Sequence, residues 1–208
     1  MPASEARGTH IFMMRHAITV WNLAGRIQGH HDAPLAPDGE RQIVAWRAAL
    51  EGWGLDRIYS SDLARAQTTA RRLNQTRGLP LAEEPRLREQ DWGEWTGRVQ
   101  RRLKQEDSAA YKRQTRRGWQ FRPPGGESQL EVLERALAAL RDISARHPGE
   151  RILVVTHEGV LKCLVYHLAI RDGCGQKPVA PAPYHLHHLT GSAGQLILKR
   201  VNVVDLNA

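Results

Sequence analysis

The chain has 208 residues, of which 41% are hydrophobic, and its 30 basic and 22 acidic residues give a formal net charge of +8. This length and hydrophobic content are sufficient for one globular domain with a substantial core, and we expect a single domain over residues 1–208. No apolar run reaches the roughly 18 residues that a membrane span needs, and residues 1–8 are too polar for a signal peptide, so the sequence predicts a cytoplasmic protein outside the membrane.

The positive charge favours anionic partners, and both phosphorylated metabolites and nucleic acid qualify. No base-stacking aromatic array and no nucleic-acid-binding motif is visible, so a small phosphorylated metabolite is the preferred partner over nucleic acid. Cys163 and Cys174 fit no metal-ligand spacing and are expected to be reduced thiols. His185, His187 and His188 lack a carboxylate or cysteine at ligand spacing, so no metal site is predicted. The oligomeric state stays open, with a homodimer as one option.

Predicted strands and helices alternate in the first half of the chain. A buried strand over residues 11–14 enters a polar loop over residues 17–37, and a helix then begins at Pro37. The apolar face of that helix is formed by Ile43, Val44, Trp46, Leu50 and Trp53. A second strand covers residues 57–59, and Ser61 with Asp62 forms a plausible N-cap for a helix that continues to Gly78. Residues 79–83 are predicted to form an edge strand.

The second half begins with an arginine-rich stretch, residues 97–118, which is expected to be helical and to contribute a variable substrate-capping segment around residues 98–122. Its cations could equally form a solvated helix face. A Pro-Pro-Gly-Gly break precedes an amphipathic helix that ends near residues 147–149. A buried strand over residues 152–155 leads into a helix over residues 160–170, a loop over residues 173–183, and a hairpin of residues 185–190 and 195–201 around residues 191–194. This alternation predicts an α/β fold, a three-layer α/β/α sandwich with a mainly parallel central sheet.

Two of the predicted strands end in a histidine, His16 after Arg15 and His157 after Thr156. Ligands of open α/β sheets bind outside the carboxyl ends of the strands, so these side chains should converge. Arg65, in the first turn of the helix after the second strand, would add a cation there. A strand-terminal histidine is often only structural, because loops at strand ends are polar, but the whole set favours phosphoryl chemistry.

In such a site His16 could attack phosphorus while the other groups hold the phosphoryl oxygens. Arginine suits that role because its planar fork binds phosphate oxygens bidentately and stays charged. A neutral imidazole is a competent nucleophile when its second nitrogen donates a hydrogen bond, and we expect the acceptor to be a backbone carbonyl in the turn of residues 17–19. Spacing alone leaves Glu89 open between a site residue and a surface carboxylate paired with Arg86 or Arg88.

Five segments in sequence order resemble the motifs of the histidine phosphatase superfamily, in its phosphoglycerate-mutase-like branch. They are Arg-His-Ala-Ile-Thr-Val-Trp-Asn at residues 15–22 with Arg-Ile-Gln-Gly at 26–29, the arginine motif at 59–70, the acid motif at 87–97, Pro-Pro-Gly-Gly-Glu-Ser at 123–128, and Val-Val-Thr-His-Glu-Gly-Val at 154–160. The resemblance implies that His16 becomes phosphorylated, that Arg15, Arg65 and His157 hold the phosphoryl oxygens, and that Glu89 is first the general acid and then the general base.

By the same resemblance, Asn22, Gln28 and Gly29 line the substrate pocket. Arg116 and Arg117, in the variable segment, are further candidates for binding the substrate. The chain departs from the family at Ala17, where glycine is usual, and at Ile18, where a carboxylate is usual. An alanine forced into positive φ would cost roughly 1 kcal/mol, so the turn after His16 could be altered.

The short middle segment resembles the phosphatase members of the family. The favoured function is therefore metal-independent hydrolysis of a phosphomonoester through a phosphohistidine, with no cofactor. Two alternatives remain: a cofactor-dependent phosphoglycerate mutase, which would yield a phosphorylated isomer, and a catalytically silent protein that binds an anion or RNA, which would release no phosphate.

Overall fold

The computed structural model describes residues 8–171 and 179–207. Cys174 and most of the predicted loop over residues 173–183 therefore lie outside the described residues. Within the described ranges, six strands form one sheet in the order β3-β2-β4-β1-β5-β6. The strands are β1 (Thr9–Arg15), β2 (Arg57–Ser60), β3 (Leu81–Glu83), β4 (Arg151–Thr156), β5 (His187–Ser192) and β6 (Gln195–Arg200). Strands β1 to β4 run parallel to one another, whereas β5 is antiparallel to both β1 and β6, so the predicted mainly parallel sheet is confirmed.

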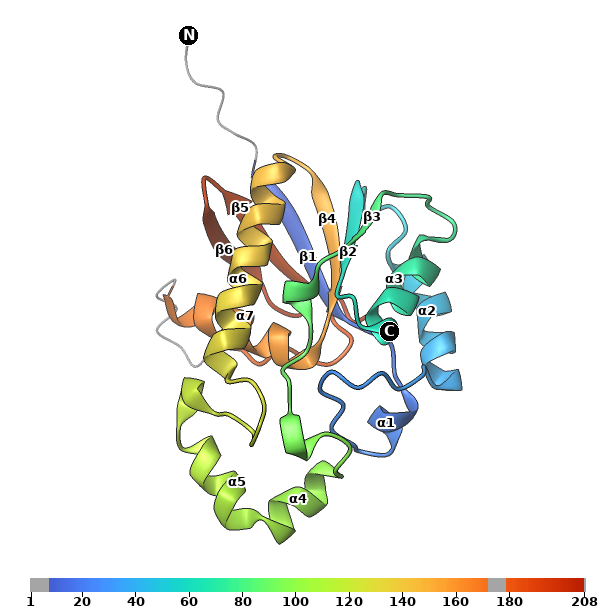
Figure 1. Cartoon of the computed structure of the whole chain (residues 1–208). Coiled ribbons are helices and arrows are strands. Elements are labelled where there is room, and N and C mark those ends of the chain that lie inside the picture. Colours follow the sequence, from blue (N-terminus) through green and yellow to red (C-terminus); the bar gives the residue numbers. More distant parts are fainter. Residues whose placement is uncertain (1–7, 172–178, 208) are drawn as a thin grey trace.

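Helices cover both faces of this sheet, which confirms the three-layer arrangement (Figure 1). The helices are α1 (Val20–Leu23), α2 (Pro37–Ala49), α3 (Ala64–Asn74), α4 (Gln100–Glu106), α5 (Ser108–Thr115), α6 (Gln129–Arg146) and α7 (Glu158–Arg171), with 3-10 turns η1 (Pro85–Leu87), η2 (Gly93–Trp95) and η3 (Gly118–Gln120). None of the helices in the described ranges is long and apolar enough to cross a bilayer.

The two faces of β1 bury alternate residues in two separate cores, as the period-2 geometry of a strand requires. Ile11 and Met13 pack in the core that α6 and α7 cover, whereas Phe12 and Met14 pack in the core that α2 and α3 cover. Strand β1 is thus buried on both sides, which explains why its sequence is a continuous apolar run.

A third cluster of buried residues anchors the segment around residues 98–122. Leu103 of α4 and Phe121 pack with Ile27 and Trp95. Figure 1 shows α4 and α5 beyond the end of the sheet at which the chain leaves β1 for α1. The segment therefore lies beyond the carboxyl ends of the parallel strands, and its substrate-capping role stays a prediction.

Several local predictions need correction. The loop over residues 17–37 contains the short helix α1, which a capping box between Thr19 and Asn22 stabilises. Helix α2 ends at Ala49, before Trp53, and Val44 is 64% exposed although it was assigned to the apolar face. Residues 97–118 form two short helices and the start of η3.

The hairpin turn is also tighter than predicted. It consists of Ala193 and Gly194, which both have positive φ, as a two-residue type I′ turn requires.

Candidate active site

The carboxyl ends of β1 and β4 bring the two sequence-predicted histidines together. Arg15 is paired with Thr156 in the parallel register, and the backbone N–H of His16 donates to the Thr156 carbonyl at 3.0 Å. His16 and His157 therefore follow the last paired residues of two neighbouring strands and lie at the same level along them. Their ring centroids are 5.2 Å apart. The convergence expected for the carboxyl edge of a parallel sheet is present here.

Hydrogen bonds orient the ring of His16 on both sides. Its Nδ1 donates to the Ala17 carbonyl at 2.7 Å, which is the backbone acceptor that the sequence predicted, and its Nε2 accepts from Nε of Arg65 at 3.3 Å. Burial lowers the pKa of His16 well below 6.5, and the neighbouring Arg15 and Arg65 lower it further. The imidazole is therefore neutral near pH 7, with the Nε2 lone pair directed at the guanidinium.

Arg65 is a buried cation that two loop carbonyls hold in place. Its Nη2 donates to Gly29 and its Nη1 to His31, each at 2.8 Å, and only 2% of the residue is exposed. Gly29 has a φ of +53°, and a Cβ there would lie 3.1 Å from the backbone nitrogen of Trp92. A glycine is thus needed for this loop to reach Arg65.

The helix that carries Arg65 begins two residues later than predicted. Helix α3 starts at Ala64, its N-cap is Leu63, and its first N–H groups are not capped by Ser61 or Asp62. Instead, Asp32 accepts a hydrogen bond from the Ala64 N–H at 2.9 Å. Oγ of Ser61 accepts from the Leu63 N–H at 3.2 Å and also contacts His157, and Arg65 still lies in the first turn.

His157 presents a buried nitrogen toward the same region. Its Nε2 forms a 2.8 Å hydrogen bond with Oγ of Ser61, whereas its Nδ1 has no partner among the described residues. Nε of Arg15 is likewise buried and unpartnered within the described ranges. Burial, Arg65 and His16, in that order, keep the pKa of His157 well below 6.5. Buried polar groups normally have partners, so these two nitrogens indicate a ligand that would supply acceptor oxygens.

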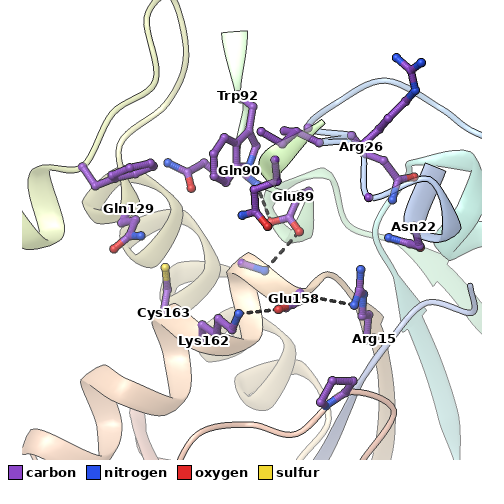
Figure 2. Close-up of a pocket in the computed structure, with 18 of the residues that line it drawn as sticks. Arg15, Asn22, Arg26, Glu89, Gln90, Trp92, Gln129, Glu158, Lys162 and Cys163 are labelled. Atoms are coloured by element: carbon purple, nitrogen blue, oxygen red, sulfur yellow. Dashed lines mark hydrogen bonds and ion pairs between the residues drawn. The ribbon is translucent and has the colours of Figure 1, made fainter. Parts of the chain in front are cut away.

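Glu158 connects the first motif to the last. Its carboxylate forms an ion pair with Nη1 of Arg15 at 2.6 Å and a second one with Lys162, one helical turn further along α7, and Figure 2 shows Glu158 between these two cations. Burial raises the pKa of Glu158, but Arg15 and Lys162 outweigh burial and leave that pKa below its ordinary value. An ionised carboxylate therefore balances the charge of Arg15.

Glu89 lies at this site and not in a surface ion pair. Its Oε2 accepts a hydrogen bond from the Gly159 N–H at 3.2 Å, at the start of α7. The two arginines that were considered as its partners bind elsewhere: Arg86 contacts Glu84 and Asp142, and Arg88 contacts Asp62. The surface-carboxylate alternative is therefore wrong.

The backbone at Glu89 is clamped from two directions. Nη2 of Arg135 donates to the Glu89 carbonyl at 3.0 Å and Nη1 to the Arg86 carbonyl at 2.7 Å, while the same guanidinium pairs with Glu127. Nε2 of His30 donates to the Glu89 carbonyl at 2.8 Å. The acid motif and the Pro-Pro-Gly-Gly-Glu-Ser segment are thus joined through Arg135.

A cavity of about 910 Å³ opens beside these groups, and His16 and His157 are buried and do not belong to its lining. Arg15, Arg65 and Glu89 line it, as do the three predicted binding residues Asn22, Gln28 and Gly29 (Figure 2 shows Asn22, Arg15 and Glu89). The described residues contain no group of three or more histidine, cysteine or acidic side chains that could hold a metal ion.

Arg116 and Arg117 were predicted to bind substrate, but the structure does not bring them to the cavity. Both are exposed and neither lines the wall. Tyr111 and Thr115, which are four residues apart and share one face of α5, form the wall instead. The two arginines follow the end of that helix. The prediction for these two residues is therefore corrected.

The departures from the family motif at Ala17 and Ile18 leave the turn intact. Ala17 is fully buried and is not among the described residues with positive φ, so the expected strain is absent. Its N–H donates to Oγ1 of Thr69 at 3.1 Å. Ile18 lines the cavity and adds an apolar surface where a charge was expected.

Sequence reasoning did not place Ser61, Glu158, Lys162 or Arg135 at the site, and it assigned Ser61 only to a helix N-cap. The i,i+4 spacing of Glu158 and Lys162 on one helix was a visible signal for an ion pair. The contacts of Ser61 and Arg135 join segments 96 and 46 residues apart, so no local pattern could reveal them. Together, the site offers a neutral imidazole nucleophile, two guanidinium groups, a buried imidazole donor and a carboxyl group, which suits transfer of a phosphoryl group.

Comparisons with known proteins agree with this geometry. A model of the histidine phosphatase superfamily (branch 1) matches residues 11–203. The metal-independent phosphoserine phosphatase of Arabidopsis thaliana is 34% identical over 209 residues, which cover 97% of this chain and 78% of the relative. The probable phosphoglycerate mutase GpmB of Cronobacter sakazakii is 39% identical over 156 residues, 74% of this chain and 72% of the relative. The solved structure of YhfR from Bacillus stearothermophilus superimposes with a TM-score of 0.80 and 31% identity, covering 95% of this chain and 99% of that chain.

Proposed function

Because the chain belongs to branch 1 of the histidine phosphatase superfamily, we propose that it hydrolyses phosphomonoesters of small metabolites through a phosphohistidine at His16, without a metal ion. The observation that carries this proposal is the neutral, buried His16, whose Nε2 accepts a hydrogen bond from Arg65. Beside it lie buried nitrogens of Arg15 and His157 that have no partner among the described residues. A phosphoryl group seated there would satisfy those donors and place phosphorus before the nucleophile.

In the first step Nε2 of His16 attacks phosphorus and the bond between phosphorus and the ester oxygen breaks. The Nδ1–H that donates to the Ala17 carbonyl fixes the tautomer and stabilises the positive charge that develops on the ring. Arg15, Arg65 and His157 hold the three non-bridging oxygens. Protonated Glu89 gives its proton to the departing alkoxide, so the alcohol leaves neutral.

In the second step water attacks the phosphohistidine. Glu89, now a carboxylate, takes a proton from that water, and the N–P bond breaks to return neutral His16 and inorganic phosphate. One carboxyl group serves both steps because the form left by the first step is the form that the second step needs. The Gly159 N–H supports this carboxylate at 3.2 Å.

Metal independence is part of the proposal because the cations of the site are supplied by the chain. Arg15 and Arg65 bring two permanent positive charges to the cavity. The name of the Arabidopsis relative, a metal-independent phosphoserine phosphatase, supports the same view. Phosphate release should therefore continue at an undiminished rate in excess chelator.

A phosphoglycerate mutase is the second candidate, and the observation in its favour is the 39% identity to the relative named as a probable mutase. The two functions share the phosphohistidine and differ in its acceptor. Water yields inorganic phosphate, whereas a second hydroxyl group yields a phosphorylated isomer. Product analysis with 3-phosphoglycerate separates them, since only a mutase forms 2-phosphoglycerate.

The deciding experiment compares wild type with His16→Ala on a panel of phosphomonoesters in the presence of chelator. We expect phosphate release by wild type and a loss of at least about three orders of magnitude in the variant, as removal of a covalent nucleophile causes. Quenching during turnover in alkaline detergent should trap phosphate on wild type alone, and acid should then release that phosphate, as expected for phosphohistidine. Equal turnover by both proteins would contradict the proposal, and salt-sensitive RNA binding without phosphate release would favour the silent alternative.

A further inference from the structure

The wall of the cavity beyond the phosphoryl end is aromatic and largely uncharged. We propose that this region is a ring-binding subsite, and that the substrates are phosphomonoesters of uncharged, ring-bearing alcohols. This inference rests on the proposed phosphatase function and names its substrate class.

The aromatic side chains of this wall come from segments far apart in the sequence. Trp92 follows the acid motif, Tyr111 lies on α5, Trp119 and Phe121 belong to the stretch at η3, and Tyr166 lies on α7. All five line the same cavity as Arg15 and Arg65. A phosphomonoester held by those arginines would therefore extend its alcohol portion among these rings.

Contacts between the rings keep part of this wall open and preformed. Phe121 packs edge-on against Trp92, with centroids 5.7 Å apart, and against Tyr111 at 6.2 Å. Trp119 meets the ring of His167 edge-on at 6.4 Å. Rings braced in this way cannot collapse into the cavity, so a bound ring gains contact area without first separating them.

The far end of the cavity carries neutral polar groups. Figure 2 shows Gln129 and Cys163 on the side of Glu89 and Glu158 opposite to Arg15. Burial raises the pKa of the Cys163 thiol to about 12, so this sulfur stays uncharged at ordinary pH. Amide and thiol groups can contact a heterocycle or a hydroxyl group, but they cannot neutralise a carboxylate.

The cavity cations outside the phosphoryl site already have partners. Among the described residues that line the cavity, these are Lys162, which pairs with Glu158, and Arg26, whose Nη1 donates to the Gly97 carbonyl at 2.8 Å. No carboxylate balances Arg26 among the described residues, but its exposed side chain extends away from Gln129 and Cys163 in Figure 2. A glycerate or serine leaving group would bring a carboxylate to the aromatic end of the cavity, where its desolvation is unfavourable. The cavity volume of about 910 Å³ also exceeds what such small groups fill, and lies in the range typical of larger organic ligands.

The test compares three esters of primary alcohols, which differ little in leaving-group chemistry: 2-phenylethyl phosphate, glycerol 3-phosphate and 3-phosphoglycerate. We expect kcat/KM for the phenylethyl ester to exceed that for glycerol 3-phosphate at least about tenfold, as burial of one ring allows. The carboxylate ester should be the poorest substrate. Trp119→Ala should lower the ratio of kcat/KM for the phenylethyl ester to kcat/KM for glycerol 3-phosphate toward one. Trp119→Phe should keep most of this ratio.

Gln120→Ala is the matched control, because Gln120 lies beside Trp119 in η3 but is exposed and does not line the cavity. It should keep the wild-type ratio. Equal kcat/KM values for all three esters, or a preference for 3-phosphoglycerate, would overturn the ring subsite and leave the phosphatase proposal standing.

A binding measurement separates failure of the subsite from failure of the proposed function. We expect 2-phenylethylphosphonate, which cannot be hydrolysed, to bind wild type at least about tenfold more tightly than methylphosphonate. If no ester is hydrolysed, the proposed function fails and this ratio still judges the subsite. Equal affinities of the two phosphonates would overturn the ring-binding inference regardless of turnover.

Discussion

Nε of Arg65 donates a hydrogen bond to Nε2 of His16 over 3.3 Å. The group expected to bind the phosphoryl oxygens is thus also the hydrogen-bond donor to the lone pair of the expected nucleophile. The arrangement holds the imidazole neutral and correctly turned, because the guanidinium can donate to Nε2 only when that nitrogen carries no proton. When a phosphate ester binds, its oxygens would take over this donor and release the lone pair for attack.

Arg65→Lys is predicted to lower kcat/KM about a hundredfold or more while the protein stays folded. The ammonium group keeps a positive charge, but it cannot at once donate to His16 and to the Gly29 and His31 carbonyls as the planar fork does. Phosphate release measures the loss, and circular dichroism checks the fold. Arg71→Lys is the matched control, since Arg71 is an exposed residue of the same helix and should retain wild-type activity. Wild-type kcat/KM in Arg65→Lys would contradict the role assigned to the guanidinium.

Gly159→Ala is predicted to impair the acid function of Glu89. A Cβ at Gly159 would lie 2.2 Å from Oε1 of Glu89, so the carboxyl group must move away. General acid catalysis contributes roughly 10²-fold to 10⁴-fold and matters most for a poor leaving group. We therefore expect a loss of about tenfold to a hundredfold with glycerol 3-phosphate and a clearly smaller loss with 4-nitrophenyl phosphate, whose leaving group needs no proton.

Gly8→Ala provides the control for a general effect of an added methyl group. A Cβ at Gly8 would make only an ordinary contact, 3.4 Å from the Gly191 carbonyl oxygen. Its kcat/KM values should match those of wild type for both esters. Equal losses of Gly159→Ala on the alkyl and aryl esters would count against a role in leaving-group protonation.

Acidification is predicted to destabilise the fold partly through His187. This residue is fully buried on β5, its Nε2 lacks a partner among the described residues, and burial lowers its pKa from 6.5 to about 4. The unfolded chain takes up the proton near pH 6.5 and the folded chain only near pH 4. The contribution to stability is therefore complete above about pH 6.5 and is lost as the pH falls from 6.5 toward 4.

At pH 5 the loss from His187 amounts to about 2 kcal/mol of the free energy of unfolding. Urea unfolding at pH 7.5 and pH 5 measures how much the free energy of unfolding falls on acidification, and this fall should be smaller by about this amount in His187→Gln than in wild type. Glutamine is chosen because its side-chain oxygen can still accept from the Asn202 N–H. His185→Gln is the comparison variant, because His185 is only part-buried and its Nε2 lies 3.9 Å from Asp205. An unchanged pH dependence in His187→Gln would refute the prediction.

The sheet and the centre of the site could be predicted from sequence because the signals are local. Strands β1 and β4 are short apolar runs, and each is followed directly by a histidine. Parallel strands place their carboxyl ends at one edge, so two local patterns were sufficient to predict that His16 and His157 lie together. Arg65 followed in the same way from its position at the start of a helix.

The sequence predicted the segment around residues 98–122 less well. Its helices are short and arginine-rich, and the side that faces the cavity is chosen by Leu103 and Phe121, which pack against Ile27 and Trp95. That contact joins distant parts of the chain and is invisible in the local pattern. Charge alone therefore suggested Arg116 and Arg117, whereas the packed face carries Tyr111 and Thr115 to the cavity.

The amino-acid sequence by itself determined the layered α/β fold, the two strand-end histidines and the backbone acceptor for Nδ1 of His16, because each follows from residues adjacent in the chain. Only the tertiary structure decided that the Glu89 carboxylate accepts from the Gly159 N–H and that Ser61 binds His157. It also decided that aromatic side chains form the wall of the cavity beyond the phosphoryl end. The physical reason is that these contacts form between segments far apart in sequence. The chain has many polar and aromatic side chains, and only the packing of these segments decides which of them contact one another.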